Sequence, residues 1–374
     1  MSSLSAKWVT LPSRGIRAKK YSNACYAFVN NSRWKENKAL AHKRYSATVL
    51  VSMQALVVFT GGTSAEAVIS RKSAAMVMAN IDRTRFAPML VHIDEDGWFA
   101  EVDGERAPTD LARIQADPAN YIGAFIMVHG TPGEDGKLQA ELEANGFEHT
   151  TGHARAMALT FHKGRAAEFL ANEGLPVARS IQIAPGSSWS KAELIDAIGL
   201  PCFVKPNETG SSIGISKVFN AEQLNAAIDT AMAIGNSGAV VESMLHGREF
   251  TSGVIPDASG RPVAMPVTEI RTSRDFFDYE AKYAGESEEI TPANISAEWT
   301  AQLQKQALEV YRAAGMRGMA RVDMISESPE QIHVIEINTV PGFSEASIIP
   351  KQAAAFGLSK MELISRIIEQ TLLV

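Results

Sequence analysis

From Met53 onward the chain alternates short apolar runs with stretches in which apolar residues recur at helical spacing. The first such unit is a run at 55–59, a turn at 61–64 and a helical pattern at 65–80. This alternation predicts strands joined by helices, and therefore an α/β fold. Further strands are expected at 89–93, 122–128, 203–205, 239–242, 249–255, 263–270, 319–325 and 332–338. Further helices are expected at 137–145, 221–234 and 297–314, before Gly174, and twice at the C-terminus.

Residues 1–53 differ in charge from the rest of the chain. They hold ten basic residues and one acidic residue, a net charge of +9, whereas the whole chain carries −6 and the remainder therefore −15. The segment lacks hydrophobic periodicity and precedes an acidic body, so we do not expect it to bind nucleic acid. We expect a disordered extension or a start codon assigned too early, with Met53 as the native first residue. A targeting segment is the alternative.

Residues 45–65 carry no charge, which raises the question of a membrane anchor. Ser46, Thr48 and Ser52 interrupt this stretch, and its apolar part is shorter than the ~18 residues that a membrane helix needs. A buried strand beginning near residue 55 is the better prediction.

Two cysteines, Cys25 and Cys202, cannot build a disulfide framework or a four-thiolate zinc site, so a reducing cytoplasm is expected.

The strongest chemical signal lies in an Arg-Val-Asp segment ending at Asp323 and a Glu-Ile-Asn segment ending at Asn338. Side chains in a strand alternate between its faces, so Arg321 shares a face with Asp323, and Glu336 with Asn338. If the strands are neighbours, two carboxylates and an amide oxygen meet, which suits a hard cation such as Mg²⁺. Arg321 would then be placed to hold an anion or a developing oxyanion. The alternative is a solvent-facing surface with an incidental salt bridge.

A lysine at a strand end, Lys205, precedes a Gly-Ser-Ser-Ile-Gly loop at 210–214. The open backbone amides and hydroxyls of such a loop suit a polyphosphate, although a tight hairpin is the alternative. The P-loop motif and the dinucleotide-binding motif are both absent, so neither of those nucleotide-binding classes is supported. Further on, Glu242 and Glu249 flank a possible edge strand that would face an adenine and a ribose, or else lie in solvent.

The stretch 276–283 combines four aromatic residues with charged ones. Solvent does not favour so many rings on a loop, so we expect it to fold over a bound molecule. Lys282 would reach a phosphate and Tyr283 would cover a substrate. The alternative is a surface loop anchored by its aromatic residues.

In this order the segments resemble the ATP-grasp superfamily, and in particular the D-alanine–D-alanine ligases. The resemblance runs from about residue 55 to the C-terminus. It is carried by Gly-Gly-Thr-Ser-Ala-Glu at 61–66, His-Gly at 129–130, Gly-Glu-Asp-Gly at 133–136, Val-Lys-Pro at 204–206, Gly-Ser-Ser at 210–212, Asp-Tyr-Glu-Ala-Lys-Tyr at 278–283, the two segments at 321–323 and 336–338, and Pro-Gly at 341–342. Residues 1–53 have no counterpart in the family.

The resemblance implies an ATP-grasp fold in three parts. These are a Rossmann-like substrate domain at 54–162, a central ATP-grasp subdomain at 163–249 and a C-terminal ATP-grasp subdomain at 250–374. The last would hold the metal and substrate sites. A homodimer built on the N-terminal domain, a cytoplasmic location and no membrane or nucleic-acid partner are also implied.

The resemblance further assigns residues to roles. Those implied for ATP are Lys163, Lys205, Ser212, Glu242, Glu249 and Lys282. Those implied for two Mg²⁺ or Mn²⁺ ions are Asp323, Glu336 and Asn338. Those implied for substrate are Glu66 and His129 at the first D-alanine, Arg321 and the Gly342 amide at the oxyanion, Ser347 at the second carboxylate, and Ser211 linked to Tyr283.

The reaction implied is the joining of two D-alanines with ATP, through D-alanyl phosphate, for peptidoglycan precursor synthesis. Alternatives are a D-alanine–D-lactate or other dipeptide ligase, and a non-catalytic ATP-binding module. Three departures from the family pattern concern the site. After Glu66 the chain reads Ala-Val-Ile-Ser at 67–70, where the family usually has charged residues before Val-Ser, a change that can alter the first-substrate pocket. Phe161 and His162 replace the usual Met-Asp before Lys163. Glu345 is expected to repel the substrate carboxylate near Ser347 unless it turns outward.

Overall fold

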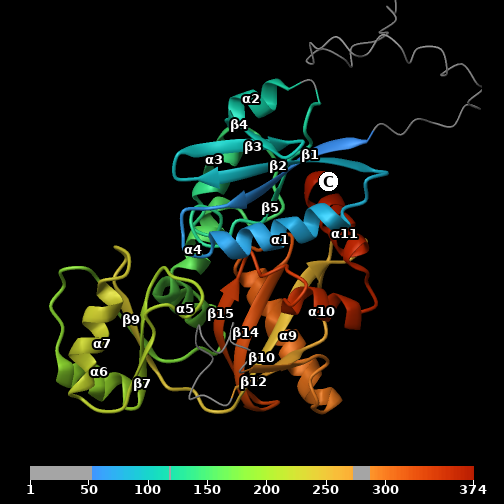
Figure 1. Ribbon diagram of the computed structural model, residues 1–374. Helices are drawn as coiled ribbons and strands as arrows, with labels where there is room; N and C mark the ends of the chain where they lie inside the picture. The colour runs from blue at the N-terminus through green and yellow to red at the C-terminus, as the bar shows by residue number, and fades with distance from the viewer. Residues whose placement is uncertain (1–52, 118, 273–286) are drawn as a thin grey trace, which may run out of the picture. The chain divides into compact units, whose positions relative to one another are not determined.

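The computed structural model describes residues 53–117, 119–272 and 287–374 (Figure 1). The basic segment at 1–52 and the aromatic stretch at 276–283, with Lys282 and Tyr283, lie outside the described residues. The described residues form one compact unit, and their strands form three sheets.

The N-terminal sheet has the strand order β4-β3-β2-β1-β5. Its strands are β1 (Gln54–Gly61), β2 (Phe86–Asp94), β3 (Gly97–Val102), β4 (Glu105–Thr109) and β5 (Ala124–Ile126). β1 pairs in parallel with β2 and β5, whereas β3 and β4 are antiparallel additions. The helices of this part are α1 (Ala67–Asn80), α2 (Leu111–Ala116), α3 (Lys137–Ala144) and α4 (Ala154–Phe161).

Two features of this sheet differ from the sequence prediction. The prediction omits β3 and β4, because Glu101, Glu105 and Arg106 interrupt the apolar pattern. β4 is an exposed edge strand, where charged side chains are usual. The strand expected at 122–128 is shorter, since only Ala124–Ile126 pairs as β5.

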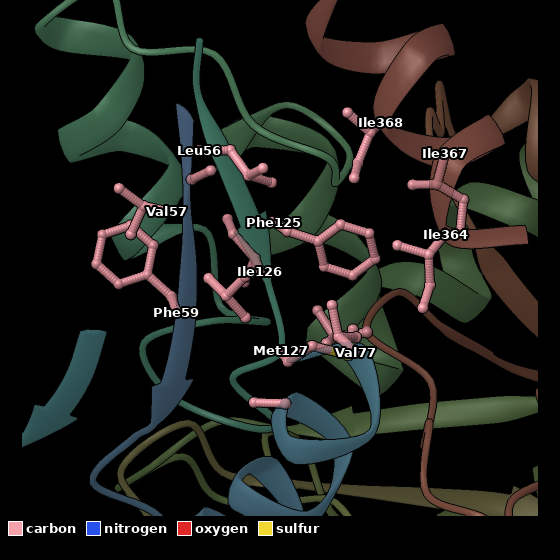
Figure 2. Packing of buried hydrophobic residues seen from close by; sticks show 14 of the residues in the cluster. Leu56, Val57, Phe59, Val77, Phe125, Ile126, Met127, Ile364, Ile367 and Ile368 are labelled. Atoms are coloured by element: carbon pink, nitrogen blue, oxygen red, sulfur yellow. The ribbon is translucent and has the colours of Figure 1, made fainter. Parts of the chain in front are cut away.

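The core under this sheet joins the two ends of the described chain. Leu56 of β1 and Phe125 of β5 pack with Val77 of α1 and with Ile364 and Ile368 of the C-terminal helix (Figure 2). That helix is α11 (Lys360–Leu372), which lies beside the N-terminal elements in Figure 1. Burying each such side chain contributes about 1.5–3 kcal/mol. The last helix therefore anchors the sheet that carries the N-terminal half of the site.

The central sheet is antiparallel, with the strand order β6-β9-β7-β8. Its strands are β6 (Ser180–Ile183), β7 (Cys202–Pro206), β8 (Ser216–Val218) and β9 (Ala239–Ser243). The helices α6 (Lys191–Ile198) and α7 (Gln223–Met232) share an apolar core with it. Helix α5 (Lys163–Asn172) precedes this sheet and begins at Lys163.

The C-terminal sheet has the strand order β13-β12-β10-β14-β15, with β11 paired to β10. Its strands are β10 (Arg248–Pro256), β11 (Pro262–Ala264), β12 (Thr268–Thr272), β13 (Ser287–Ile290), β14 (Ala320–Ser328) and β15 (Gln331–Asn338). Helices α9 (Ala297–Ala313) and α10 (Ile348–Ala355) accompany it.

The single strand predicted at 263–270 is wrong. It is divided into β11 and β12, and the break contains Pro266, which has no N–H for a ladder hydrogen bond. In the part of the chain that the structure describes, each helix is too short or too polar to traverse a lipid bilayer.

Candidate active site

A cluster of charged and polar side chains lies on the neighbouring strands β14 and β15. The register pairs Arg321 with Asn338 and Asp323 with Glu336, so the two strands are neighbours, which is the condition for the predicted cluster. Arg321 donates two hydrogen bonds to the Asp323 carboxylate, from Nε at 2.8 Å and from Nη2 at 2.7 Å. Asn338 Nδ2 and Thr251 Oγ1 donate to the same carboxylate at 2.8 and 2.6 Å. The strand register and these hydrogen bonds thus hold two carboxylates and an amide together. We call Asp323, Glu336 and Asn338 the carboxylate cluster.

Arg321 remains charged in this setting. Its side chain is only 17% exposed, and burial opposes the charge. The Asp323 carboxylate, with smaller contributions from Glu336 and Glu289, opposes this effect, and the net result is a pKa of Arg321 above its ordinary value. The site therefore offers a fixed positive charge beside its carboxylates.

A first cavity lies between the central sheet and the strands β14 and β15. Lys205 Nζ is 2.5 Å from Glu242 Oε2 within it. Burial is the largest single effect and lowers the pKa of Lys205. The Glu242 carboxylate, with smaller contributions from Glu336 and Glu249, raises this pKa, and the net shift is upward. The described residues predicted to bind ATP all line this cavity: Lys163, Lys205, Ser212, Glu242 and Glu249.

Lys163 begins helix α5 and connects this cavity to the carboxylate cluster. Its Nζ donates to the Thr209 carbonyl at 2.7 Å and lies 3.5 Å from Glu336 Oε2. Although Phe161 and His162 differ from the residues usual in the family, the side chain of Lys163 still points into the site. His162 Nδ1 instead accepts a hydrogen bond from the Arg165 amide and caps the helix.

A second cavity lies beside the first. Of the predicted substrate and metal residues, it is lined by Glu66, His129, Ser211, Arg321, Glu336, Asn338, Gly342 and Ser347. The two cavities share Gly210, Ser211 and Glu336 in their linings. They therefore meet where the glycine-serine loop approaches β15.

The glycine-serine loop contacts the N-terminal part of the chain directly. Ser211 Oγ donates to Glu66 Oε1 at 2.6 Å. A Cβ on Gly210 would lie 2.3 Å from Glu66 Oε2, so only glycine allows this approach without a shift of the carboxylate. Ser211 and Ser212 have φ of 52° and 58°, a region that serine adopts at a cost of about 1–3 kcal/mol each. The predicted link from Ser211 to Tyr283 involves a residue outside the described range.

Replacing Ser211 with alanine tests the role that the sequence resemblance implies for Glu66, which is binding of the first D-alanine. The hydroxyl orients the Glu66 carboxylate, and a hydrogen bond to a charged group is worth about 1.5–3 kcal/mol. We expect kcat/KM for D-alanine to fall by about tenfold to a hundredfold at saturating ATP, with melting temperature as the check on folding. An unchanged kcat/KM for D-alanine would show that the hydroxyl does not position Glu66.

His129 is held by hydrogen bonds on both ring nitrogens. Nδ1 donates to the Val340 carbonyl at 2.7 Å, so Nε2 accepts from Ser73 Oγ at 2.9 Å. Ser73 Oγ in turn accepts from the Phe343 amide. Burial lowers the pKa of His129 to about 4; the bond to Val340 opposes this effect and the charge of Arg321 adds to it. The imidazole is therefore neutral at physiological pH.

His129 should make the folded state sensitive to acid. The unfolded chain binds a proton near pH 6.5, whereas the folded chain binds it only near pH 4, so stability falls as the pH is lowered between these values. The total loss from this group is about 3 kcal/mol. Urea unfolding of wild type and His129→Gln at pH 7 and pH 4 measures it. The difference in the free energy of unfolding between the two proteins should be about 3 kcal/mol smaller at pH 4 than at pH 7. A difference that is the same at both pH values would contradict the lowered pKa of His129.

Glu134 is a site residue that the sequence prediction did not assign. It lines the second cavity, and its carboxylate accepts hydrogen bonds from the Gly130 amide at 2.7 Å and the Val340 amide at 3.2 Å. Burial raises its pKa, and the nearby Glu66 raises it further. The sequence contained one indication of this role, because Glu134 is an acidic residue in the glycine-rich turn that follows a predicted strand.

The loop after β15 places Ser347 at the N-terminus of α10. Ser347 Oγ accepts a hydrogen bond from the Ser344 amide at 2.9 Å, and it lies beside Gly342. Glu345 points outward with its side chain 81% exposed and forms an ion pair with Lys360. The repulsion that this carboxylate would cause near Ser347 is therefore relieved by its orientation.

Comparison with known proteins identifies the family. Residues 169–369 match the family described as D-ala D-ala ligase C-terminus. The D-alanine–D-alanine ligase of Azobacteroides pseudotrichonymphae is 37% identical over 324 residues, covering 85% of this chain and 99% of the relative. The VanG D-Ala:D-Ser ligase from Enterococcus faecalis superposes with a TM-score of 0.76 at 28% identity, covering 85% of this chain and 99% of that one.

A further solved structure is the D-alanine–D-alanine ligase from Bacillus anthracis complexed with ATP. It has a TM-score of 0.69 and 26% identity, and covers 85% of this chain and 97% of that one. These matches confirm the ATP-grasp fold and the ligase class predicted from the sequence. The chain belongs to the D-alanine–D-alanine ligase family.

Proposed function

We propose that the chain joins two D-alanine molecules, using ATP, to give D-alanyl-D-alanine, ADP and phosphate for peptidoglycan precursor synthesis. The observation that carries this proposal is the meeting of the two cavities at Gly210, Ser211 and Glu336. A nucleotide in the first cavity would place its terminal phosphate next to a carboxylate substrate in the second. The family and the ATP complex of the Bacillus anthracis relative support the same pairing of substrates.

The first cavity is proposed to bind ATP. Lys163 and Lys205 would contact the phosphates, with Ser212 of the glycine-serine loop beside them. Glu242 and the backbone after it would face the adenine, and Glu249 the ribose. Two lysines near the transferred phosphate would neutralise charge that spreads over its oxygens in the transition state. Lys282, outside the described residues, is proposed to complete this group.

The carboxylate cluster fits a divalent cation. Asp323 and Glu336 lie opposite each other on adjacent strands, and Asn338 lies two residues after Glu336. Their carboxylate and amide groups offer oxygen ligands, which Mg²⁺ and Mn²⁺ prefer. We propose that these three residues hold two such ions. When bound, the ions would supply charge neutralisation at the phosphates.

The second cavity is proposed to bind both D-alanines. Glu66 would hold the ammonium of the first, with neutral His129 nearby, and its carboxylate would attack the γ-phosphate to give an acyl phosphate. The amine of the second would then attack the acyl carbon and release phosphate. Arg321 and the Gly342 amide would donate to the tetrahedral oxyanion, each worth about 3 kcal/mol.

The remaining proposals concern substrate position and assembly. Ser347 would bind the carboxylate of the second D-alanine, and Tyr283 would contact Ser211. The division at 54–162, 163–249 and 250–374 is proposed as the domain organisation. A homodimer and a cytoplasmic location are also proposed, on the support of the family likeness.

Trapping the intermediate tests this function. With ATP, Mg²⁺ and D-alanine the enzyme should release phosphate, and added hydroxylamine should convert the acyl phosphate to D-alanine hydroxamate. L-alanine is the matched control, because its ammonium and methyl groups cannot both occupy the same positions. Phosphate release that does not depend on D-alanine would contradict the proposal.

A further inference from the structure

Three potential metal ligands converge where helix α3 ends and helix α4 begins. Glu143 lies in the last turn of α3, His153 immediately precedes α4, and His149 lies in the connection between them. One ligand atom from each of the three lies within 4.8 Å of the other two. None of the three lines either cavity of the candidate active site.

The two distances from Glu143 to the histidines in this cluster are close to those expected around a single ion. Glu143 Oε1 is 3.2 Å from His149 Nε2 and 3.0 Å from His153 Nδ1. Ligands placed about 2.0–2.1 Å from a tetrahedral zinc ion are separated from one another by about 3.3 Å. An ion could therefore enter with small side-chain movements and no change in the backbone.

His149 is already held in the orientation of a ligand. Its side chain is 1% exposed, and its Nδ1 lies 3.2 Å from Thr151 Oγ1. Thr151 Oγ1 accepts a hydrogen bond from Gln139 Nε2 at 3.0 Å, which fixes the hydroxyl. Metal-binding histidines usually have such a partner on the ring nitrogen that does not bind the metal. His153, with 62% of its side chain exposed, leaves the cluster open to ions from solvent.

We propose that Glu143, His149 and His153 bind a divalent transition-metal ion of the Zn²⁺ class, with water as a fourth ligand. Two imidazoles select such an ion over Mg²⁺, whereas the oxygen donors at 323, 336 and 338 have the opposite preference. Glu143 Oε1 also accepts from the Ala154 amide at 3.0 Å. The ion would therefore join the end of α3 to the start of α4, the helix that leads into Lys163.

Metal titration of the full chain tests this site. Untagged, metal-free protein in excess Mg²⁺, which occupies the oxygen donors, is titrated with Co²⁺ for its visible absorption and with Zn²⁺ against a chromophoric chelator. We expect a visible Co²⁺ band that Zn²⁺ removes, and a melting temperature that Zn²⁺ raises. His153→Ala should weaken Zn²⁺ binding by more than about tenfold and abolish that rise.

The exposed position of His153 makes this variant one that folds, so the test does not depend on replacing the buried His149. His333→Ala is the matched control, a partly exposed histidine on β15 outside the cluster, and it should bind Zn²⁺ as wild type does. Equal Zn²⁺ affinity in wild type and His153→Ala, or no Co²⁺ band in the wild type, would overturn the proposal. Because binding and melting are measured without D-alanine or ATP, either result is independent of the ligase assignment.

Discussion

Glu336→Gln should lower kcat by a factor of about 10³ while leaving the fold intact. Glu336 lines both cavities and lies 3.5 Å from Lys163, and it is a proposed metal ligand opposite Asp323. Glutamine keeps the shape of the side chain but removes the charge that holds a cation against the phosphates. The measurement is phosphate release at saturating ATP and D-alanine, with melting temperature as the check on folding.

Glu327→Gln is the matched control for this substitution. Glu327 is an exposed glutamate near the end of β14, outside both cavities, and its variant should retain wild-type turnover. Glu336→Ala should be at least as inactive as Glu336→Gln. Turnover near that of the wild type in Glu336→Gln would count against the proposed metal site.

Arg321→Lys should reduce kcat by about 10²–10³ with a smaller effect on KM. The guanidinium uses Nε and Nη2 to hold Asp323, and the same side chain lines the second cavity. The single ammonium of lysine cannot reproduce both contacts at once. The loss should fall on kcat, because the oxyanion exists only after the substrates are bound.

The lysine variant is chosen to keep a positive charge beside Asp323. Arg321→Ala would leave that carboxylate, 8% exposed, without its ion-pair partner, and breaking such a pair costs about 3–5 kcal/mol of stability. Arg312→Lys, at an exposed arginine of α9, is the control and should be neutral. A rise in KM with kcat unchanged in Arg321→Lys would indicate substrate binding in place of oxyanion stabilisation.

Local patterns predicted much of the fold. The segments at 321–323 and 336–338 were correctly predicted to lie in strands, because polar and apolar residues alternate along them. The prediction at 263–270 failed because apolar content alone conceals the effect of Pro266 on pairing. β4 was missed because an edge strand need not be apolar.

The contacts that complete the site could not be predicted from local patterns. Ser211 and Glu66 are 145 positions apart, and only the packing of the central and N-terminal parts brings them together. Glu345 turns outward and forms an ion pair with Lys360 of a later helix. The enclosure of Glu134 requires the backbone amide of Val340. These contacts join residues that are far apart in the sequence. The periodicity and the residue types of a short segment therefore cannot predict them.

The most direct test of the ligase assignment is mass spectrometry of the product formed from ATP and a mixture of D-alanine, L-alanine, D-serine and D-lactate. The mixture lets every acceptor compete for the second position at one enzyme concentration. We predict that D-alanyl-D-alanine is the main product near neutral pH. A main product containing D-lactate, D-serine or an L-residue, or no product at all, would contradict the proposed function.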